Sequence, residues 1–553
     1  MQSLRSLHSL GPEGGHKRRP ARVVLAICVV VMVVATLPTA AYAFASASSQ
    51  ATHPVTAARA TSTAKAASVP SSQPRALASY GSAAATPQRQ NAPGTAASGA
   101  HSSPTQTVKA STQPSAQSST NPSGHPTAQP SSQGSAPASS SPSPNNPGNV
   151  WYVATNGSDS ADGSQGSPWL TLQHAADVAT GTVYARGGSY SGFTVTRSGL
   201  KFVAYPGETP IVTGGSGRKD VVVFRGVDGG SLAGFTVQGN QTAYGCGIRV
   251  DGSQNVSLTG NVIRSNHSFG IGIMKSGNVV VSGNELTAND TGVEVEYGLD
   301  GNVIRSNYIH DNVTPVDSSR GRDGVNVYYT AGTTSISVNT FEHNGTHVEY
   351  YESSNITISG NSMSDGSALE SGTDPGGSCR NIRFVRNIIT RTNFGEYSDG
   401  LILRCASDSL FANNTISSVD KFAFDVIDGT QGVEFGGSVA GLQIENNIIV
   451  NCRAFSIDNV LPSSVVIDYN LVWGTSSADY GQYMAYVNGR GNTSSLDTFR
   501  SWTGYQAHGL QVDPKFADSD MHLSAQSPAI DMGAILPGVS YTGVAPDLGC
   551  WER

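Results

Sequence analysis

Acidic residues are almost absent from the first 148 residues, which contain Glu13 alone beside ten Lys and Arg residues. Residues 46–148 have no acidic residue, few apolar ones, and a large share of Ser, Ala, Thr, Pro, Gln and Gly. A segment of this composition buries too little apolar surface to offset its chain entropy. The sequence therefore excludes a folded domain here, and we expect residues 44–148 to form a disordered spacer.

A long membrane-spanning apolar run is also missing near the N-terminus. The run Val23–Leu37 is shorter than the roughly 20 apolar residues that a membrane helix needs. It follows a basic segment (17–22) and precedes Ala41-Tyr42-Ala43, whose two alanines suit a cleavage site. Because this order is typical of a secretory signal peptide, we expect cleavage of residues 1–43, no stable membrane span afterwards, and a secreted or cell-surface protein. A retained anchor is the alternative.

Basic residues are scarce in the rest of the chain. Ten of the 33 Lys and Arg residues and one of the 40 Asp and Glu residues precede residue 149, so residues 149–553 carry 23 − 39 = −16 charges. Nucleic-acid binding needs a basic surface, so we expect no nucleic-acid partner, and we expect a monomer. The sequence also lacks a CxxC pair, a phosphate loop, a dinucleotide fingerprint and an HExxH motif, which excludes the sites that these motifs form.

One short pattern recurs nine times between Val256 and Val472, at intervals of about 22 residues with some longer gaps. Its centre is an asparagine with an apolar residue three positions before it and another two positions after it. The asparagines are Asn261, Asn284, Asn307, Asn339, Asn361, Asn387, Asn414, Asn447 and Asn470. A unit of this length cannot bury its own apolar face, so the units must stack.

This spacing fits two short strands joined by a tight bend. We expect the asparagine to take the left-handed conformation of that bend and its amide to bond to the next amide along the stack. A third strand follows in each unit, with apolar residues at its second and fourth positions except at Ser371. The sequence thus predicts an all-β domain over residues 149–553, a single-stranded right-handed parallel β-helix, which is a solenoid.

An amphipathic helix is expected just before the first coil, between Ser167 and Gly181. Its apolar side consists of Leu172, Ala175, Ala176 and Ala179. Because an open end of the stack would expose apolar side chains and strand edges, we expect this to be an N-terminal capping helix.

Two of the five cysteines beyond residue 43 fall at nearly the same place in successive units. Cys379 lies eight residues before Asn387, and Cys405 lies nine before Asn414. Stacking could bring the two within disulfide range in an exported protein. The odd count leaves at least one thiol unpaired or bonded elsewhere.

Two insertions interrupt the regular units on the same side, at 310–323 and 390–399, and both end in Asp-Gly. Insertions on one face of a solenoid usually border its binding surface. Between them, the outward third and fifth positions of the third strand form two columns of polar and aromatic residues. The third positions are Glu294, Asn326, Glu349, Glu370, Ile402 and Asp425, and the fifth are Glu296, Tyr328, Tyr351, Gly372, Arg404 and Ile427. Tyrosine rings and carboxylates at this spacing suit a sugar polymer, although a solvated polar face is the alternative.

The ends of the domain resemble a known group of proteins. The segment 151–195, with Asn156-Gly157-Ser158-Asp159 and SPWLTLQHA, is similar to the opening of secreted proteins of the pectate-lyase-like superfamily, and 513–552 is similar to the closing region of the bacterial choice-of-anchor Q group. The resemblance covers about residues 150–553 and implies a β-helix. This architecture hosts lyases, hydrolases, epimerases and non-catalytic proteins.

One segment within the coils resembles a lyase motif. Residues Asp399 to Arg404 are similar to the Asp-Gly-apolar-x-x-Lys element of family-nine polysaccharide lyases, in which the aspartate binds calcium and the last residue abstracts a proton. The resemblance implies possible calcium binding by Asp399 and Asp425. In the same way, Glu294-x-Glu296 resembles the calcium-binding Glu-x-Glu of family-six lyases.

The predicted catalytic and binding residues follow from lyase chemistry, which removes a proton beside a neutralised uronate carboxylate. Arg404 could neutralise that carboxylate, and Tyr328 or Lys421 could be the base. The full catalytic set is Arg404, Asp399, Tyr328, Asp323 and Lys421. The predicted substrate-binding set is Glu294, Glu296, Asn326, Glu349, Tyr351 and Glu370.

The sequence favours β-elimination on an extracellular uronate-containing polysaccharide, with two alternatives. Paired carboxylates could hydrolyse a glycosidic bond instead, with candidates among the residues already named. The domain could also be a non-catalytic glycan-binding or cell-surface structural protein. Apart from calcium, no cofactor is expected.

Overall fold

The computed structural model describes residues 149–553 except 216, 314–321, 393–398, 432–434, 460 and 475–482. The expected signal peptide (1–43) and spacer (44–148) lie outside the described residues. No helix in the described part of the chain is long and apolar enough to cross a membrane.

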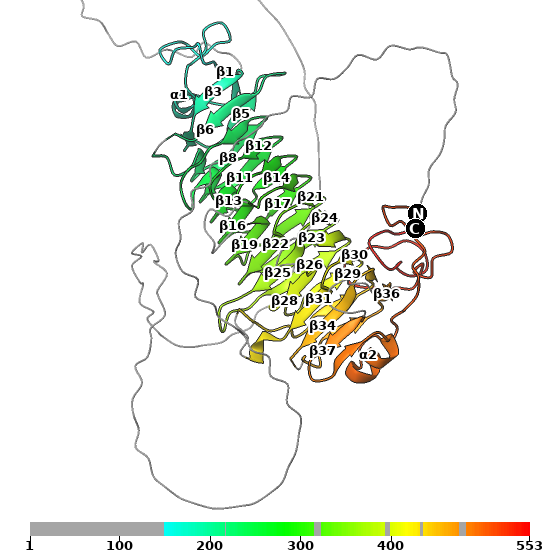
Figure 1. Ribbon diagram of the computed structural model, residues 1–553. Coiled ribbons are helices and arrows are strands. Elements are labelled where there is room, and N and C mark those ends of the chain that lie inside the picture. The colour runs from blue at the N-terminus through cyan, green and yellow to red at the C-terminus, as the bar shows by residue number, and fades with distance from the viewer. Residues whose placement is uncertain are drawn as a thin grey trace, which may run out of the picture. The chain divides into compact units, whose positions relative to one another are not determined.

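Three sheets run side by side along the domain, and each is built from every third strand of the chain (Figure 1). The first sheet consists, in order, of β1 (Val150–Val153), β2 (Thr182–Ala185), β5 (Leu200–Ala204), β8 (Asp228–Ala233), β11 (Gln254–Thr259), β14 (Val280–Ser282), β17 (Asn302–Arg305), β20 (Thr334–Ser337), β23 (Ser354–Ser359), β26 (Arg380–Val385), β29 (Leu410–Ala412), β32 (Gln443–Glu445) and β35 (Val466–Asp468).

The second sheet carries the third strand of each repeat and contains most of the predicted site. It consists of β4 (Phe193–Val195), β7 (Val222–Arg225), β10 (Cys246–Asp251), β13 (Phe269–Met274), β16 (Thr291–Glu296), β19 (Asp323–Tyr328), β22 (Thr346–Tyr351), β25 (Ser367–Gly372), β28 (Leu401–Leu403), β31 (Phe422–Ile427), β34 (Arg453–Asp458), β37 (Ala485–Val487) and β38 (Gly491–Thr493).

The third sheet follows the asparagine of each repeat. It consists of β3 (Gly188–Ser191), β6 (Pro210–Thr213), β9 (Thr236–Gln238), β12 (Val262–Arg264), β15 (Glu285–Thr287), β18 (Tyr308–His310), β21 (Thr340–Glu342), β24 (Ser362–Ser364), β27 (Ile388–Thr392), β30 (Thr415–Val419), β33 (Ile448–Val450) and β36 (Leu471–Trp473). A short 3-10 helix, η1 (Gly429–Gln431), follows β31.

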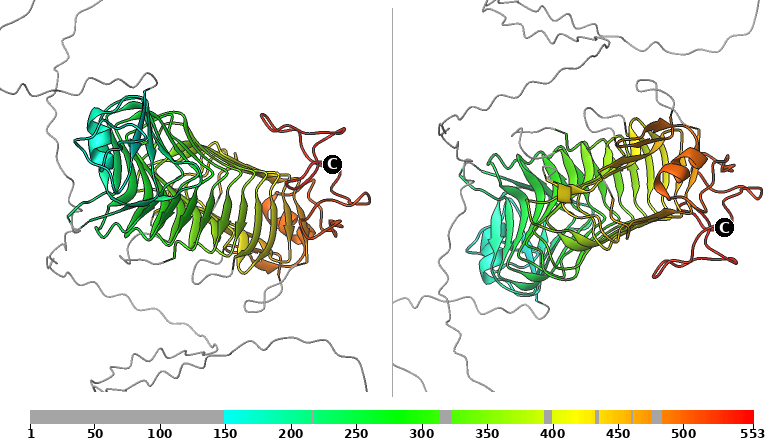
Figure 2. Two further views of the ribbon diagram at one scale, coloured as in Figure 1. Left: turned by 90° about the horizontal axis from the view of Figure 1, so that it is seen from above. Right: turned by 90° about the horizontal axis from the view of Figure 1, so that it is seen from below.

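Neighbouring strands in these sheets are parallel except β37 and β38, which are antiparallel, and Figure 2 shows the coils stacked on one another. The inward residues are apolar and fully buried, as Val293 and Val295 of β16 and Val325 and Val327 of β19 illustrate. The predicted right-handed parallel β-helix is therefore confirmed, and its continuous apolar core holds the stack together.

The asparagine ladder is confirmed at all nine positions. The backbone N–H of Asn261 donates to Oδ1 of Asn284, which lies one coil further on, at 2.9 Å, and this bond repeats along the stack to Asn470. Each of these side-chain amides also donates to the next asparagine, as in the 3.0 Å bond from Nδ2 of Asn361 to Oδ1 of Asn387. These bonds satisfy buried backbone groups at the bend.

The left-handed conformation lies one residue earlier than the sequence pattern predicted. The ladder asparagines do not have positive φ, whereas the residues that precede them do, with φ of 63° at Gly260, 54° at Ser306 and 56° at Val338. The asparagine keeps an ordinary backbone because its role is to pair with the next coil, and the preceding residue makes the bend.

Both ends of the coil stack carry a helix. Helix α1 (Leu172–Val178) begins after the N-cap Thr171, four residues later than expected, and its Leu172, Ala175 and Ala176 join the core. Helix α2 (Leu496–Thr503) lies near the last coils (Figure 2), where Phe499 stacks on Phe455 at 5.5 Å between ring centroids.

The closing segment packs back onto the coils. Leu523 and Leu548 form an apolar cluster with Ile448 and Leu471, and Glu552 Oε1 lies 2.9 Å from Nη2 of Arg386. The segment therefore stabilises several coils from outside. Its likeness to the choice-of-anchor Q group stays a resemblance.

A disulfide joins Cys379 to Cys405, as their places in successive units allowed. The bond links the loop after β25 to the end of β28, directly beside Arg404. The other cysteines of the described chain, Cys246, Cys452 and Cys550, are buried thiols.

Candidate functional site

The predicted column of polar residues lies on the outer side of the second sheet. Glu294, Asn326, Glu349 and Glu370 occupy the same register on β16, β19, β22 and β25. Ile402 and Asp425 continue the column on β28 and β31. Carboxylates on adjacent strands at this spacing repel each other unless a proton, a cation or a ligand intervenes.

Asp323 is the carboxyl group most strongly affected by this crowding. Asp323 begins β19, is 5% exposed and forms a hydrogen bond with the Asn326 side chain. Asp323 ends the predicted insertion (310–323), of which residues 314–321 lie outside the described residues. Burial and the charges of Glu370, Glu294 and Asp290 together raise the pKa of Asp323 to about 8, against a hydrogen bond with the Asn326 side chain that lowers it. Asp323 is therefore a protonated acid at neutral pH.

Asn326 supplies a second sign of a binding site. Its side chain is 2% exposed, and its Oδ1 atom has no hydrogen-bond partner among the described residues. Buried amide oxygens are normally paired, because desolvation without a hydrogen bond is costly. This acceptor lies beside the acid of Asp323, where a hydroxyl group of a ligand could donate to it.

Tyr328 closes one side of the acid cluster. Burial raises the pKa of its phenol far above the ordinary value, and the charges of Glu349, Asp323 and Glu294 add to the shift. The environment therefore keeps Tyr328 neutral and disfavours the predicted role of general base. A neutral phenol can donate a hydrogen bond to a ligand or to a neighbouring carboxylate.

Arg404 is held by a carboxylate. Its Nη1 lies 2.8 Å from Oε1 of Glu370, and its backbone N–H donates to Oγ of Ser371 at 2.9 Å. Ser371, the polar exception in the repeat, is buried and bonds in turn to the carbonyl of Ile402. This ion pair leaves Arg404 less able to neutralise a uronate.

Asp399, Lys421 and Asp425 form a separate group further along the sheet. Nζ of Lys421 lies 3.7 Å from Oδ2 of Asp399, and the N–H of Phe422 donates to Oδ1 at 3.1 Å. Burial raises the pKa of Asp399, and burial together with the charge of Asp399 raises the pKa of Asp425 to about 6. The insertion before Asp399 lies outside the described residues at 393–398.

Whether this group could bind calcium depends on how many oxygen ligands it supplies. Calcium takes about six to eight oxygen ligands, whereas Asp399 and Asp425 supply two carboxylates, and Lys421 already places a positive charge beside one of them. No group of three or more suitable ligands occurs in the described ranges. The described residues therefore do not fit a calcium site, and calcium binding stays a prediction.

The remaining predicted binding residues lie at the edge of the acid cluster. Glu296 and Tyr351 flank Tyr328 in register. The hydroxyl of Tyr351 donates to Oδ1 of Asp374 at 2.6 Å, and its ring lies 5.8 Å from that of Tyr328. The structure therefore places one group of predicted residues around Tyr328 and another around Asp399.

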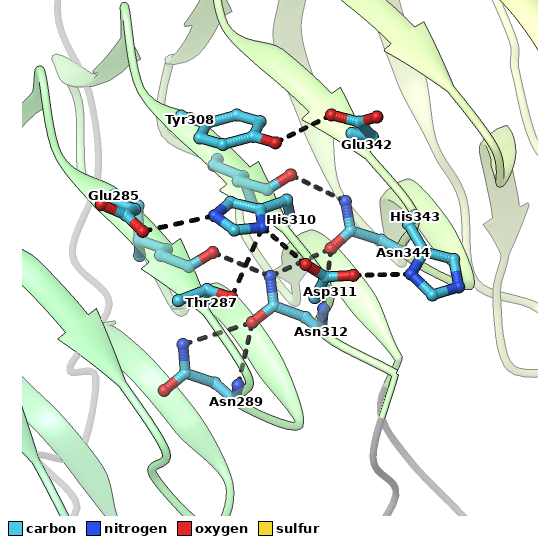
Figure 3. Close-up of polar contacts among 12 residues, drawn as sticks. Glu285, Thr287, Asn289, Tyr308, His310, Asp311, Asn312, Glu342, His343 and Asn344 are labelled. Carbon is cyan, nitrogen blue, oxygen red and sulfur yellow. Dashed lines mark hydrogen bonds and ion pairs between the residues drawn. The ribbon is translucent and has the colours of Figure 1, made fainter. Parts of the chain in front are cut away.

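A further polar cluster, which the sequence interpretation missed, lies on the third sheet (Figure 3). Asp311 contacts two imidazoles, with Oδ2 at 2.8 Å from Nδ1 of His310 and Oδ1 at 2.6 Å from Nδ1 of His343. Tyr308 stacks on His310, and its hydroxyl donates to Glu342 at 2.8 Å. The pairs connect neighbouring coils above a second asparagine ladder that includes Asn289, Asn312 and Asn344. The regular spacing of those asparagines was the available sequence signal.

Comparisons with known proteins agree with this architecture. A family profile described as "Right handed beta helix region" matches residues 217–362 and 323–499, a span of more than half of the 553 residues. The chain belongs to this right-handed β-helix family. The search of curated proteins gave no match.

Solved structures with a similar fold include enzymes that act on polysaccharides. Pectate lyase Pel9A is 15% identical, with 73% of this chain and 96% of that chain covered and a TM-score of 0.36. The family 28 exopolygalacturonase of Yersinia enterocolitica is 13% identical, with 61% and 77% covered and a TM-score of 0.38. The catalytic unit of the GH87 alpha-1,3-glucanase of Streptomyces thermodiastaticus is 15% identical, with 60% and 63% covered and a TM-score of 0.43. At this similarity the comparison concerns the fold alone.

Proposed function

We propose that this protein is a secreted glycoside hydrolase that cleaves an extracellular polysaccharide at the acid cluster of Asp323 and Glu370. The single observation that carries the proposal is a buried carboxyl group, Asp323, with a pKa of about 8, in the same cluster as the Glu370 side chain, which lies 2.8 Å from Nη1 of Arg404. Glycoside hydrolysis needs two carboxyl groups, one protonated and one ionised.

Each group has a defined task in this mechanism. The Asp323 carboxyl donates its proton to the oxygen of the leaving sugar as the glycosidic bond breaks. Glu370 accepts a proton from the water molecule that attacks the anomeric carbon, so that a hydroxyl group replaces the leaving sugar, and Arg404 holds the Glu370 carboxylate in position. The amide oxygen of Asn326 and the phenol of Tyr328 orient sugar hydroxyls by accepting and donating hydrogen bonds.

The charge of the cluster favours a neutral sugar over a uronate. A uronate carboxylate would approach Asp290, Glu294, Glu349 and Glu370, and the nearby cation of Arg404 is already paired with Glu370. Like charges at these distances repel, so β-elimination at this cluster would need an additional cation. We therefore favour hydrolysis over the lyase reaction that the sequence motif predicted.

Incubation of the protein with neutral and uronate polysaccharides, with calcium or with a chelator, distinguishes the reactions. Hydrolysis yields reducing ends without ultraviolet-absorbing unsaturated products, and we expect this result with a neutral polymer and no calcium requirement. Unsaturated ends that depend on calcium would contradict the proposal and support the lyase. Retention on a glycan column without turnover would identify a binding protein.

The pH profile gives an independent test. Because Asp323 must be protonated to act as the acid, kcat/KM is expected to fall as pH rises through about 8. A profile that stays flat across that range would exclude Asp323 as the acid.

A further inference from the structure

An uninterrupted row of aromatic side chains runs alongside the acid cluster, and it adds Tyr297, Tyr329 and Phe435 to the two tyrosines of the predicted column. The row consists of Tyr297, Tyr329, Tyr328, Tyr351 and Phe435. Tyr328 belongs to both the row and the cluster, since the charges of Glu349 and Asp323 act on its phenol. The row therefore passes the proposed catalytic groups at its middle.

Ring contacts connect each member of the row to the next. Tyr297 stacks on Tyr329 at 5.5 Å between ring centroids, and Tyr329 meets Tyr351 edge-on at 5.9 Å. Phe435 meets Tyr351 at 6.5 Å. Tyr297 and Phe435 are each 48% exposed, so ring surface at both ends of the row is open to a ligand.

Three members of the row take an unfavourable backbone conformation. Tyr297, Tyr329 and Phe435 have φ of 52°, 49° and 58°, in the left-handed region that bulky side chains rarely adopt. Glycine or asparagine fits such positions with less strain. Lys275 and Glu352 adopt the same conformation directly after β13 and β22, so the φ values of Tyr297 and Tyr329 belong to the bend that follows each strand of the second sheet.

Phe435 reaches the row through a return of the chain. It follows β31, yet its carbonyl accepts from the N–H of Thr373 at 3.1 Å, beside β25. Gly372 leaves room for this approach, because a Cβ atom there would lie 3.1 Å from the Tyr351 ring and 3.5 Å from the Phe435 carbonyl oxygen. Phe435 therefore lies beside Tyr351 and completes the row.

We infer that this aromatic row binds successive sugar rings of a polysaccharide chain that lies along the solenoid axis and passes the acid cluster. The inference rests on the proposed function and defines its substrate as a polymer. From β16 to β25 the row covers three coil spacings of ~4.8 Å, roughly 14 Å, which is longer than a single sugar ring can contact. Glu296 and Asp374, which lie beside the rings, supply acceptors for sugar hydroxyls.

The experiment measures binding without turnover, in protein that carries Asp323→Asn. Affinities for soluble xylan, β-mannan and mixed-linkage β-glucan, and for disaccharides prepared from each, are measured by affinity electrophoresis and calorimetry. In this background Tyr297→Ala and Phe435→Ala are each expected to weaken binding of the recognised polymer about three- to tenfold, as the loss of one ring contact implies. Binding of the disaccharide should change less than about twofold, since it can rest on the acid cluster alone.

Two control variants separate the ring from other effects. Tyr297→Phe keeps the ring and should retain the affinity of its parent, and Tyr541→Ala removes a tyrosine of similar exposure elsewhere on the surface. Circular dichroism and melting curves verify that each variant is folded. Unchanged polymer affinity in Tyr297→Ala and Phe435→Ala, with a parent that binds polymer, would overturn the row and leave the proposed hydrolase standing. A parent that binds none of these carbohydrates would overturn both.

Discussion

Two aspartates on neighbouring faces of the same coils show opposite electrostatics. Asp311, on the third sheet, lies between two histidines, and the hydrogen bond from His343 lowers its pKa. Asp323, on the second sheet, is buried among other carboxyl groups, and its pKa rises to about 8. The first arrangement stabilises an ionised group, whereas the second opposes ionisation.

The difference separates polar residues that support the fold from those that serve a site. Around Asp311 each new coil supplies a partner for the one before it, as the asparagine ladders also do (Figure 3). Around Asp323 successive coils add the carboxyl groups of Glu294, Glu349 and Glu370, and the repulsion among them does not favour folding. Such unfavourable groupings in a regular solenoid mark a functional site.

The largest expected effect comes from removal of the acid. Asp323→Asn should lower kcat for polysaccharide hydrolysis by about 10²- to 10⁴-fold, because the amide cannot donate the catalytic proton. Asp311→Asn is the matched control and should keep kcat within about twofold of the unmodified protein, as it lies on another sheet. Equal losses in the two variants would remove the distinction between the two clusters.

A large loss of stability is expected from the ladder. Asn361→Ala removes the side chain that bonds to Ile336 and Asn387 and that receives two bonds from Asn339, so buried donors and acceptors lose their partners. At about 1–3 kcal/mol for each unsatisfied group, unfolding in urea should show a loss of roughly 3–5 kcal/mol. The exposed Asn492→Ala should cost under about 0.5 kcal/mol. A ladder variant with unchanged stability and altered ligand affinity would contradict the structural role.

The two aspartates also predict opposite dependences of stability on pH. The folded pKa of Asp323, about 8, lies above its unfolded value near 3.9, so between these values the folded state holds a proton that the unfolded state has lost. The contribution of Asp323 to stability therefore falls as pH rises from about 4 to 8. Urea unfolding should show Asp323→Asn gaining stability relative to the unmodified protein across this window. A constant difference would show that Asp323 has an ordinary pKa.

The smallest effect is expected at Asp311. Its folded pKa is lowered, so its contribution is present above the unfolded pKa and is lost as pH falls through the folded value. The side chain is half exposed, and exposed ion pairs contribute about 0–1 kcal/mol. Asp311→Ala should therefore reduce the unfolding free energy by less than about 1 kcal/mol near neutral pH, and a larger loss would show that this cluster does more than join exposed turns.

Sequence periodicity was enough to predict the coils and the register of the site. The nine asparagines recur because each coil must satisfy the same bend, so Glu294, Asn326, Glu349 and Glu370 could be aligned before the structure was known. The same periodicity placed Cys379 beside Cys405. Structural constraints that repeat in every coil can be recognised from a single sequence, because the same residue types recur at regular intervals.

Sequence periodicity could not predict features that depend on loops outside the repeat or on charge interactions between side chains of different coils. Phe435 reaches Tyr351 because the chain returns after β31, and no repeat position marks that return. The Glu370–Arg404 pair joins side chains that lie two positions out of register on neighbouring strands. The raised pKa of Asp323 depends on burial that only the assembled coils create. For this reason the lyase motif at Asp399 seemed more informative in the sequence than the acid cluster did.

The most direct test of this account is the protonation state of Asp323 at neutral pH. Difference infrared spectra between the unmodified protein and Asp323→Asn, recorded over a pH titration, isolate the carbonyl stretch of this one protonated carboxyl group. The account predicts that the band is present at pH 7 and disappears as pH rises through about 8. Absence of the band at pH 7, with its appearance only near pH 4, would show an ordinary carboxylate and contradict the assignment of Asp323 as the acid.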